Sequence, residues 1–148
     1  MTTQSNTESI ISENLNENLL KVGFEKVDFE PVVQNRFIVK TDDIPSHLIK
    51  SVVMPFYHNS DIGPEWSILK LYIYNPVNVQ LEKSLVKVLK KKKMVLQVLY
   101  LSPIGEVITT WNIDADVDSI DFGKFDWSNT GDPNIISVCL DVKKVEIE

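Results

Sequence analysis

The two-residue alternation of apolar and polar side chains constrains this chain more than any other feature. Alternate side chains of an extended strand point to opposite faces of a sheet, so this period predicts half-buried β-strands. Turn-forming Pro, Gly, Asn and Asp separate the runs, and Pro55, which cannot donate a ladder hydrogen bond, is expected to end one of them before a loop at residues 56–64. The predicted strands are residues 36–40, 48–54, 66–74, 94–101, 106–113, 117–122 and 135–147.

One segment has a helical period instead. Leu81, Leu85, Val88 and Leu89 recur at helical spacing and predict a single amphipathic helix at about residues 80–92. Six or seven strands with one helix predict a mainly β (α+β) fold, an antiparallel β-sandwich or barrel with the helix at its side. Residues 102–105 (Ser-Pro-Ile-Gly) are typical of a hairpin turn between two of the strands.

A chain of 148 residues is suited to one folded domain, which we place at residues 26–148. Residues 1–25 are polar, with scattered apolar side chains at roughly helical spacing, and are predicted to be a flexible or partly helical arm. The arm either orders against a neighbouring molecule or is a terminus without a role. No apolar run is long enough for a membrane-spanning helix, and the first residues lack the pattern of a signal peptide, so we expect a soluble protein made in a cytoplasm.

Residues that carry chemistry are few and scattered. Cys139 has no partner cysteine and lies in an alternating apolar stretch, so we expect a buried, inert thiol. His47 and His58 lie in or beside loops without a nucleophile or metal-ligand pattern, and no glycine-rich phosphate loop is present. We therefore predict no catalytic, cofactor-binding or metal-binding residues, and a protein that is not an enzyme.

The charges are distributed unevenly. The formal net charge is −6, which disfavours tight binding to a nucleic-acid backbone. Asp114, Asp116 and Asp118 alternate with Ala115 and Val117, so on a strand they line one face as an acidic stripe, which we favour over a calcium loop or an acid–base pair. The segment 83–93 contains six lysines and no acid, and Lys90, Lys91, Lys92 and Lys93 fall at the C-terminal end of the helix, where cations stabilise the helix dipole. They are interpreted as a solvated helix end or an intersubunit patch, or alternatively as part of a small nucleic-acid-binding module.

The segment 119–128 predicts a tight structural corner. Gly123 can adopt a positive φ where the chain reverses, and Asp126 or Ser128 can hydrogen-bond the loop backbone. We expect the large aromatic side chains of this corner to be buried against the sheet. These are Phe122, Phe125 and Trp127.

Three successive segments carry a family resemblance. They are 107–113 (VITTWNI), 119–128 (SIDFGKFDWS) and 135–142 (IISVCLDV). This succession resembles the C-terminal half of the tail tube proteins of contractile-tailed bacteriophages, and segments 35–39 and 49–55 resemble the first strand pair of that family. The similarity spans about residues 31–146, and it departs from the family pattern after Asp141, where many members have an aromatic residue.

The resemblance implies a virion structural protein with no cofactor. Its subunits would form hexameric rings, joined into a β-barrel around a lumen, and the rings would stack into a tube inside the sheath of a tail assembled in the host cytoplasm. The implied partners are further copies of the chain, sheath and baseplate proteins, and viral DNA passing through the lumen, which the acidic stripe would face. A related baseplate or neck ring protein, such as the tube initiator, and a secretion-system tube protein are the alternatives within this class.

Overall fold

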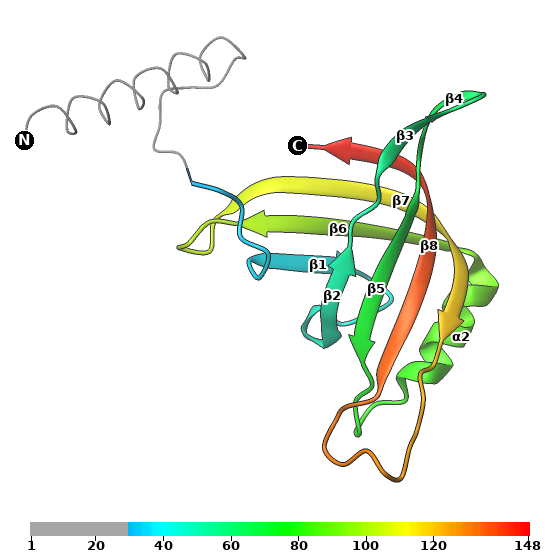
Figure 1. The fold of residues 1–148 in the computed structure, drawn as a ribbon. Coiled ribbons are helices and arrows are strands. Elements are labelled where there is room, and N and C mark those ends of the chain that lie inside the picture. The colour runs from blue at the N-terminus through cyan, green and yellow to red at the C-terminus, as the bar shows by residue number, and fades with distance from the viewer. Residues whose placement is uncertain (1–29) are drawn as a thin grey trace, which may run out of the picture. The chain divides into compact units, whose positions relative to one another are not determined.

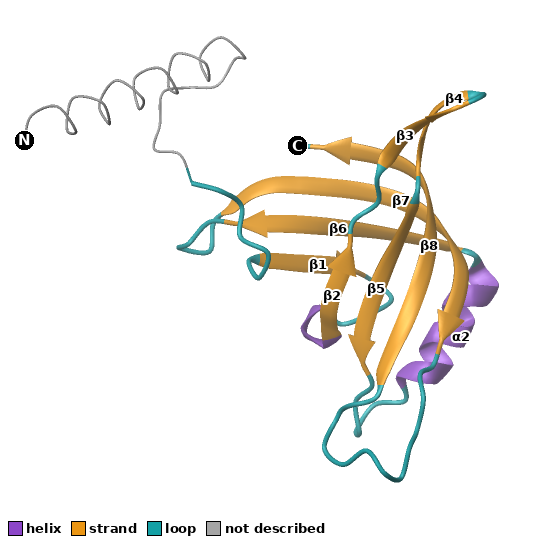
Figure 2. Cartoon of the chain, in the orientation of Figure 1, coloured by secondary structure: helices purple, strands orange, loops and turns teal. Residues whose placement is uncertain are grey.

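The computed structural model describes residues 30–148, and Val32–Glu148 form one folded unit (Figure 1). The arm predicted for residues 1–25 lies outside the described residues. The elements in chain order are β1 (Phe37–Thr41), the 3-10 turn η1 (Ser46–Leu48), β2 (Ile49–Val53), β3 (Tyr57–Ser60), β4 (Gly63–Trp66), β5 (Ile68–Tyr74), α2 (Leu81–Lys91), β6 (Lys93–Leu101), β7 (Val107–Asp121) and β8 (Ile135–Ile147) (Figure 2).

Six of these strands form one antiparallel sheet in the order β1-β6-β7-β8-β5-β2. The sheet curls into a nearly closed barrel, and the edge strands β1 and β2 lie on either side of the remaining opening (Figure 1). The predicted fold class, a mainly β barrel-like domain with one flanking helix, is confirmed. Among residues 30–148 no strand pairs with the outer edge of β1 or of β2, so each edge has backbone groups available to a further strand.

The core is formed by the inward-facing half of each alternating strand. Leu69, Leu71 and Ile73 of β5 lie beside Leu140, Val138 and Ile136 of β8, and all six side chains are fully buried. Helix α2 packs against β6 and β7 and adds three buried side chains, which are Leu81, Leu85 and Val88. No polar or charged residue is buried in the described part of the chain, so the side chains of the core make apolar contacts only.

The helix begins and ends close to its predicted limits. Lys92 follows it with a φ of 69°, and its backbone N–H donates to the carbonyls of Val88 and Leu89 at 3.0 and 3.2 Å. This left-handed residue closes the last turn and directs the chain straight into β6. Within residues 30–148, no helix is long and apolar enough to cross a membrane.

The prediction of a loop at residues 56–64 is wrong, because most of this segment forms the β3–β4 hairpin. The hairpin continues the β2–β5 pair beyond the sheet (Figure 1). Tyr57 stacks on Trp66 with ring centroids 4.5 Å apart, and the Ser60 hydroxyl donates to the carbonyl of Gly63 at 2.8 Å across the turn. Cross-strand pairs and turn bonds of this kind stabilise a segment that lacks an apolar alternation. The described chain therefore has eight strands rather than six or seven.

Two further predictions need correction. Residues 106–113 and 117–122 were expected to be separate strands, but β7 runs unbroken from Val107 to Asp121 with bulges that absorb register shifts against β8. The residues between the two segments stay paired with β6 on one side and β8 on the other. Cys139 is half-buried rather than buried, because it alternates with the core residues Val138 and Leu140 and so faces away from the core.

Candidate assembly surfaces

The connection between β7 and β8, residues 122–134, projects from one end of the sheet and is called the aromatic loop here (Figure 1). Its base is held by Asn134, whose side-chain NH2 donates to the carbonyl of Phe122 at 3.3 Å. Asn75 ties the same residue to the end of β5, because its side chain donates to Asn134 Oδ1 at 3.1 Å and its backbone N–H to the Asn134 carbonyl at 3.2 Å. Gly123 reverses the chain there with a φ of 84°.

The tip of the loop is ordered by its own polar side chains. Asp126 Oδ1 accepts hydrogen bonds from the Ser128 N–H at 2.9 Å and from the Ser128 hydroxyl at 2.7 Å. These hydrogen bonds to Ser128 lower the pKa of Asp126 below its usual range, because they favour the ionised carboxylate. The predicted local bonding of Asp126 and Ser128 is therefore present in the structure.

The expectation that the aromatic side chains of this corner are buried is wrong. Trp127 is fully exposed, with 101% of its reference area accessible, Phe125 is 81% exposed and Phe122 is 37% exposed. The chain reverses as expected, but the reversal directs the two outer rings into solvent rather than onto the sheet. Two large rings are thus presented on a loop whose base and tip are both hydrogen-bonded.

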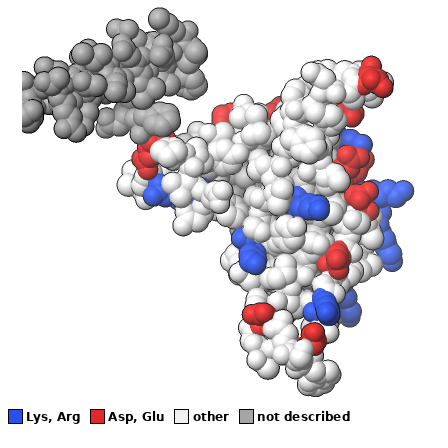
Figure 3. All heavy atoms as spheres, in the orientation of Figure 1, with Lys and Arg blue, Asp and Glu red and all other residues white. Residues whose placement is uncertain are grey.

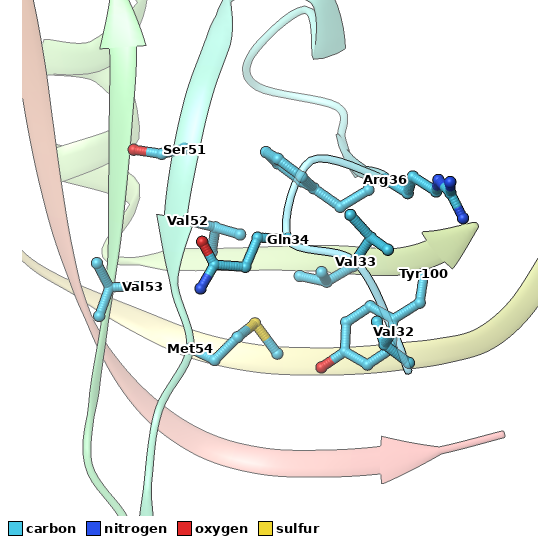
Figure 4. Close-up of a pocket in the computed structure, with 11 residues that line it drawn as sticks. Val32, Val33, Gln34, Arg36, Ser51, Val52, Val53, Met54 and Tyr100 are labelled. Carbon is cyan, nitrogen blue, oxygen red and sulfur yellow. The ribbon is translucent and has the colours of Figure 1, made fainter. Parts of the chain in front are cut away.

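A second surface lies at the opening of the barrel. A hollow of about 480 Å³, called the edge groove here, separates the segment leading into β1 from β2 (Figure 4). Val52 and Met54 from the β2 side face Val32, Val33 and Tyr100 across it (Figure 4). The remaining lining residues are Gln34, Arg36, Phe37, Ser51, Val53 and Val98. They come from segments far apart in the sequence, so no local pattern could have predicted the groove.

Aromatic packing links this groove to the β3–β4 hairpin. Tyr100 lies 6.3 Å from Trp111 between ring centroids, and Trp111 meets Trp66 edge-on at 5.7 Å. Burial raises the pKa of Tyr100, since the phenolate is disfavoured away from water. These contacts place rigid, partly buried rings beside the opening, where they support one wall of the groove.

The acidic stripe has the predicted alternation but mixed surroundings. Asp114 and Asp118 are exposed and Asp116 is half-buried, whereas Ala115 and Val117 between them are buried. Lysines flank two of the three aspartates, since Lys93 pairs with Asp116 across the β6–β7 register and Lys144 pairs with Asp114 across β7–β8. The hydrogen bond from Lys143 to Asp141, at 2.8 Å, raises the pKa of that neighbouring lysine. Acidic and basic side chains are also interspersed along one side of the face in Figure 3, whose centre is mostly uncharged.

The remaining candidate residues lie on the surface. Lys90, Lys91, Lys92 and Lys93 are all exposed, and the Lys91 ammonium lies 3.8 Å from the Asp43 carboxylate. His47 is exposed, and His58 is half-buried with its Nε2 3.2 Å from Glu65 Oε1 across the β3–β4 hairpin. No group of three or more His, Cys, Asp or Glu side chains among residues 30–148 is arranged to hold a metal ion. The most prominent surfaces of residues 30–148 are therefore the aromatic loop, the edge groove and the two edges of the sheet.

Comparison with known proteins gives a fold-level relationship. Neither a protein-family model nor a curated protein matches the sequence. Among solved structures, a chain from the PVC sheath/tube terminator of an extracellular contractile injection system, in the extended state, superposes with a TM-score of 0.61 at 18% identity, over 82% of this chain and 99% of that chain. A chain from the tube-terminating cap of the anti-feeding prophage superposes equally well, with a TM-score of 0.61 at 16% identity, over 84% of this chain and 95% of that chain.

Two further structures extend this likeness to other parts of such particles. A chain from the PVC sheath-tube complex has a TM-score of 0.56 at 19% identity, over 80% of this chain and 91% of that chain. A chain from the anti-feeding prophage baseplate has a TM-score of 0.57 at 16% identity, over 82% of this chain and 97% of that chain. The chain therefore has a fold found in structural components of contractile injection systems, which agrees with the resemblance to contractile-tail proteins.

Proposed function

We propose that the chain is a non-enzymatic structural subunit of a contractile tail or contractile injection system, and that it forms the inner tube as stacked hexameric rings. The observation that carries the proposal is the share of each similar chain that the structural match covers. The fold accounts for 99% of the terminator chain and 91% of the sheath-tube chain, so it matches whole components rather than one domain of a larger protein. On this proposal the protein is part of the tail, assembled in the host cytoplasm, and its partners are further copies of itself, sheath and baseplate proteins.

The unpaired sheet edges support ring formation. A sheet with open edges tends to pair with other chains, and a closed ring of subunits satisfies those edges without leaving a site for uncontrolled growth. In this chain β1 and β2 are the two ends of the curled sheet, so a neighbour can extend the sheet at either end. A continuous barrel of sheets around a lumen is the closed arrangement we propose.

The charge of the chain suits a conduit for DNA. With a net charge of −6 per subunit, an assembled ring repels a phosphate backbone more than it retains it. We assign the stripe of Asp114, Asp116 and Asp118 to the lumen, and Lys90 to Lys93 at the end of α2 to a contact between subunits. Transient, non-specific passage of DNA is the behaviour expected of such a lumen.

A ring that ends the tube is the second candidate. Two of the similar chains come from a sheath/tube terminator and from a tube-terminating cap, each with a TM-score of 0.61. A terminator or initiator ring needs self-association within one ring but must not stack indefinitely, which is the physical difference between the two candidates.

Negative-stain electron microscopy of the purified full chain tests both candidates. Long hollow tubes are the expected result and support the inner-tube subunit, whereas isolated rings support the terminator or initiator. Persistent monomers at high protein concentration contradict both. Fluorescence anisotropy with DNA at low salt tests the alternative of a nucleic-acid module at residues 83–93, for which we expect no binding.

A further inference from the structure

We propose that the aromatic loop of one subunit inserts Phe125 and Trp127 into the edge groove of a second copy of the chain. This contact rests on the proposed function, because it would hold together the subunits of the proposed assembly. It concerns two surfaces that are both complete within residues 30–148.

The loop has the properties of an anchor. Phe125 is 81% exposed and Trp127 is fully exposed, and neither ring lines the groove of its own chain. Adjacent large rings that face water are costly to maintain and mark surfaces that are covered on binding. The bonds from Ser128 to Asp126 at the tip and from Asn134 to Phe122 at the base already restrict the loop, which lowers the conformational entropy lost when it docks.

The edge groove has the properties of a matching receptor. Its volume is about 480 Å³, and Val32, Val52, Met54 and Tyr100 give it an apolar lining. Met54 contributes a flexible thioether that can adapt to an inserted ring and make sulfur–aromatic contacts. The groove also lies between the two unpaired edge strands, so a neighbour that docks there sits beside backbone groups that need partners.

The area involved fits a contact between copies of one chain. Two aromatic side chains bury roughly 300 to 500 Å² together, compared with about 800 Å² per partner in an interface of standard size. The loop thus provides about half of a stable interface, and the adjoining strand edges can provide the rest. Because loop and groove are different surfaces of the same chain, the contact is heterologous and generates rings or stacks, as a tube requires.

Single substitutions of the exposed rings test the anchor. Trp127→Ser and Phe125→Ser remove side chains that are mostly exposed in the monomer, so folding should be unchanged by circular dichroism. Val77→Ser is the matched control, because Val77 is also fully exposed (106%) but lines neither surface. We expect each loop variant to raise the concentration at which half of the protein sediments as assemblies by at least tenfold, and the control to shift it by less than twofold.

Disulfide trapping tests the docking partner. In a Cys139→Ser background, protein with Asn129→Cys, an exposed loop position that keeps both Phe125 and Trp127, is mixed with protein carrying Val32→Cys, which places a thiol on the groove wall. Under mild oxidation we expect a disulfide-linked dimer of the two different variants, and no such dimer when Val77→Cys replaces Asn129→Cys. Since each chain has one thiol, this product can form only between subunits.

The outcomes separate the inference from the proposed function. Rings or tubes formed equally well by Trp127→Ser, or absence of the cross-link between Asn129→Cys and Val32→Cys in assembled particles, overturn the docking contact and leave the structural role intact. Occupation of the groove by residues 1–29 of the same chain would give this second result. A wild-type chain that stays monomeric overturns both.

Discussion

Substitution of Gly123 by alanine is the sharpest test of the structure at the base of the aromatic loop. A Cβ at this position would lie 2.6 Å from Asn134 Nδ2 and 2.6 Å from the backbone carbonyl oxygen of Ile135. Real Cβ atoms do not approach other heavy atoms so closely, so Asn134 or the start of β8 must move. The residue also has a φ of 84°, which is strained for any residue with a Cβ.

The expected cost follows from these two effects. Holding alanine at a left-handed φ costs about 1 to 2 kcal/mol, offset by about 0.4 to 1 kcal/mol from the lower entropy of the unfolded chain. Displacing Asn134 breaks its hydrogen bond to Phe122 and disturbs the one from Asn75, at about 0.5 to 1.5 kcal/mol each. Together we expect Gly123→Ala to lower the free energy of unfolding by about 1 to 4.5 kcal/mol, and by more than the backbone effect alone.

Gly105→Ala is the matched control for the backbone effect alone. Gly105 has nearly the same φ, 86°, but its added Cβ would meet no atom within 4 Å. We expect it to cost about 1 kcal/mol or less. Urea unfolding followed by circular dichroism, at one low protein concentration for all variants, measures both values. Equal losses for Gly123→Ala and Gly105→Ala would refute the close approach of Gly123 to Asn134 and Ile135.

Three further changes test other parts of the structure. Leu85→Ala opens a cavity between α2 and the sheet, where Leu85 is fully buried, and should cost about 2 to 5 kcal/mol in the same urea assay, whereas Val86→Ala on the exposed side should stay within about 0.5 kcal/mol. Ser128→Ala removes the main cause of the lowered pKa of Asp126, so a carboxyl NMR titration should show this pKa rising towards its usual range; an unchanged value would contradict the hydrogen bonds of the loop tip. Because the folded-state pKa of Asp126 is depressed, its stabilising effect is present above the unfolded-state pKa and is lost as the pH falls through the folded value. Replacing Asp114, Asp116 and Asp118 together by Asn should leave assembly intact and increase co-sedimentation of DNA with the particles, whereas loss of assembly would place the stripe in an interface.

The local patterns of the sequence were sufficient for most of the fold. The alternation at residues 135–147 predicted β8 with its observed limits, and the helical spacing of Leu81, Leu85 and Val88 predicted α2 to within a residue of each end. These patterns succeed because the side-chain period of a strand or helix is set by its backbone geometry, and one face of each element must be buried. The positive φ of Gly123 and the turn at residues 102–105 are equally local, since they depend on the conformations that single residues allow.

Where the local sequence patterns failed to predict the structure, tertiary contacts determined it. Residues 57–64 have no strand pattern, and they belong to a hairpin because β2 and β5 already hold the two chain segments in register. The composition of residues 122–128 indicates a corner but not what covers it, and within the described part of the chain no other element buries Phe125 or Trp127. The edge groove exists only because the sheet curls until β1 and β2 approach without pairing. The sequence by itself thus determined the strands, the helix and the turns, whose causes lie within a few residues. Only the tertiary structure decided which apolar side chains stay exposed, because burial depends on segments that are distant along the chain.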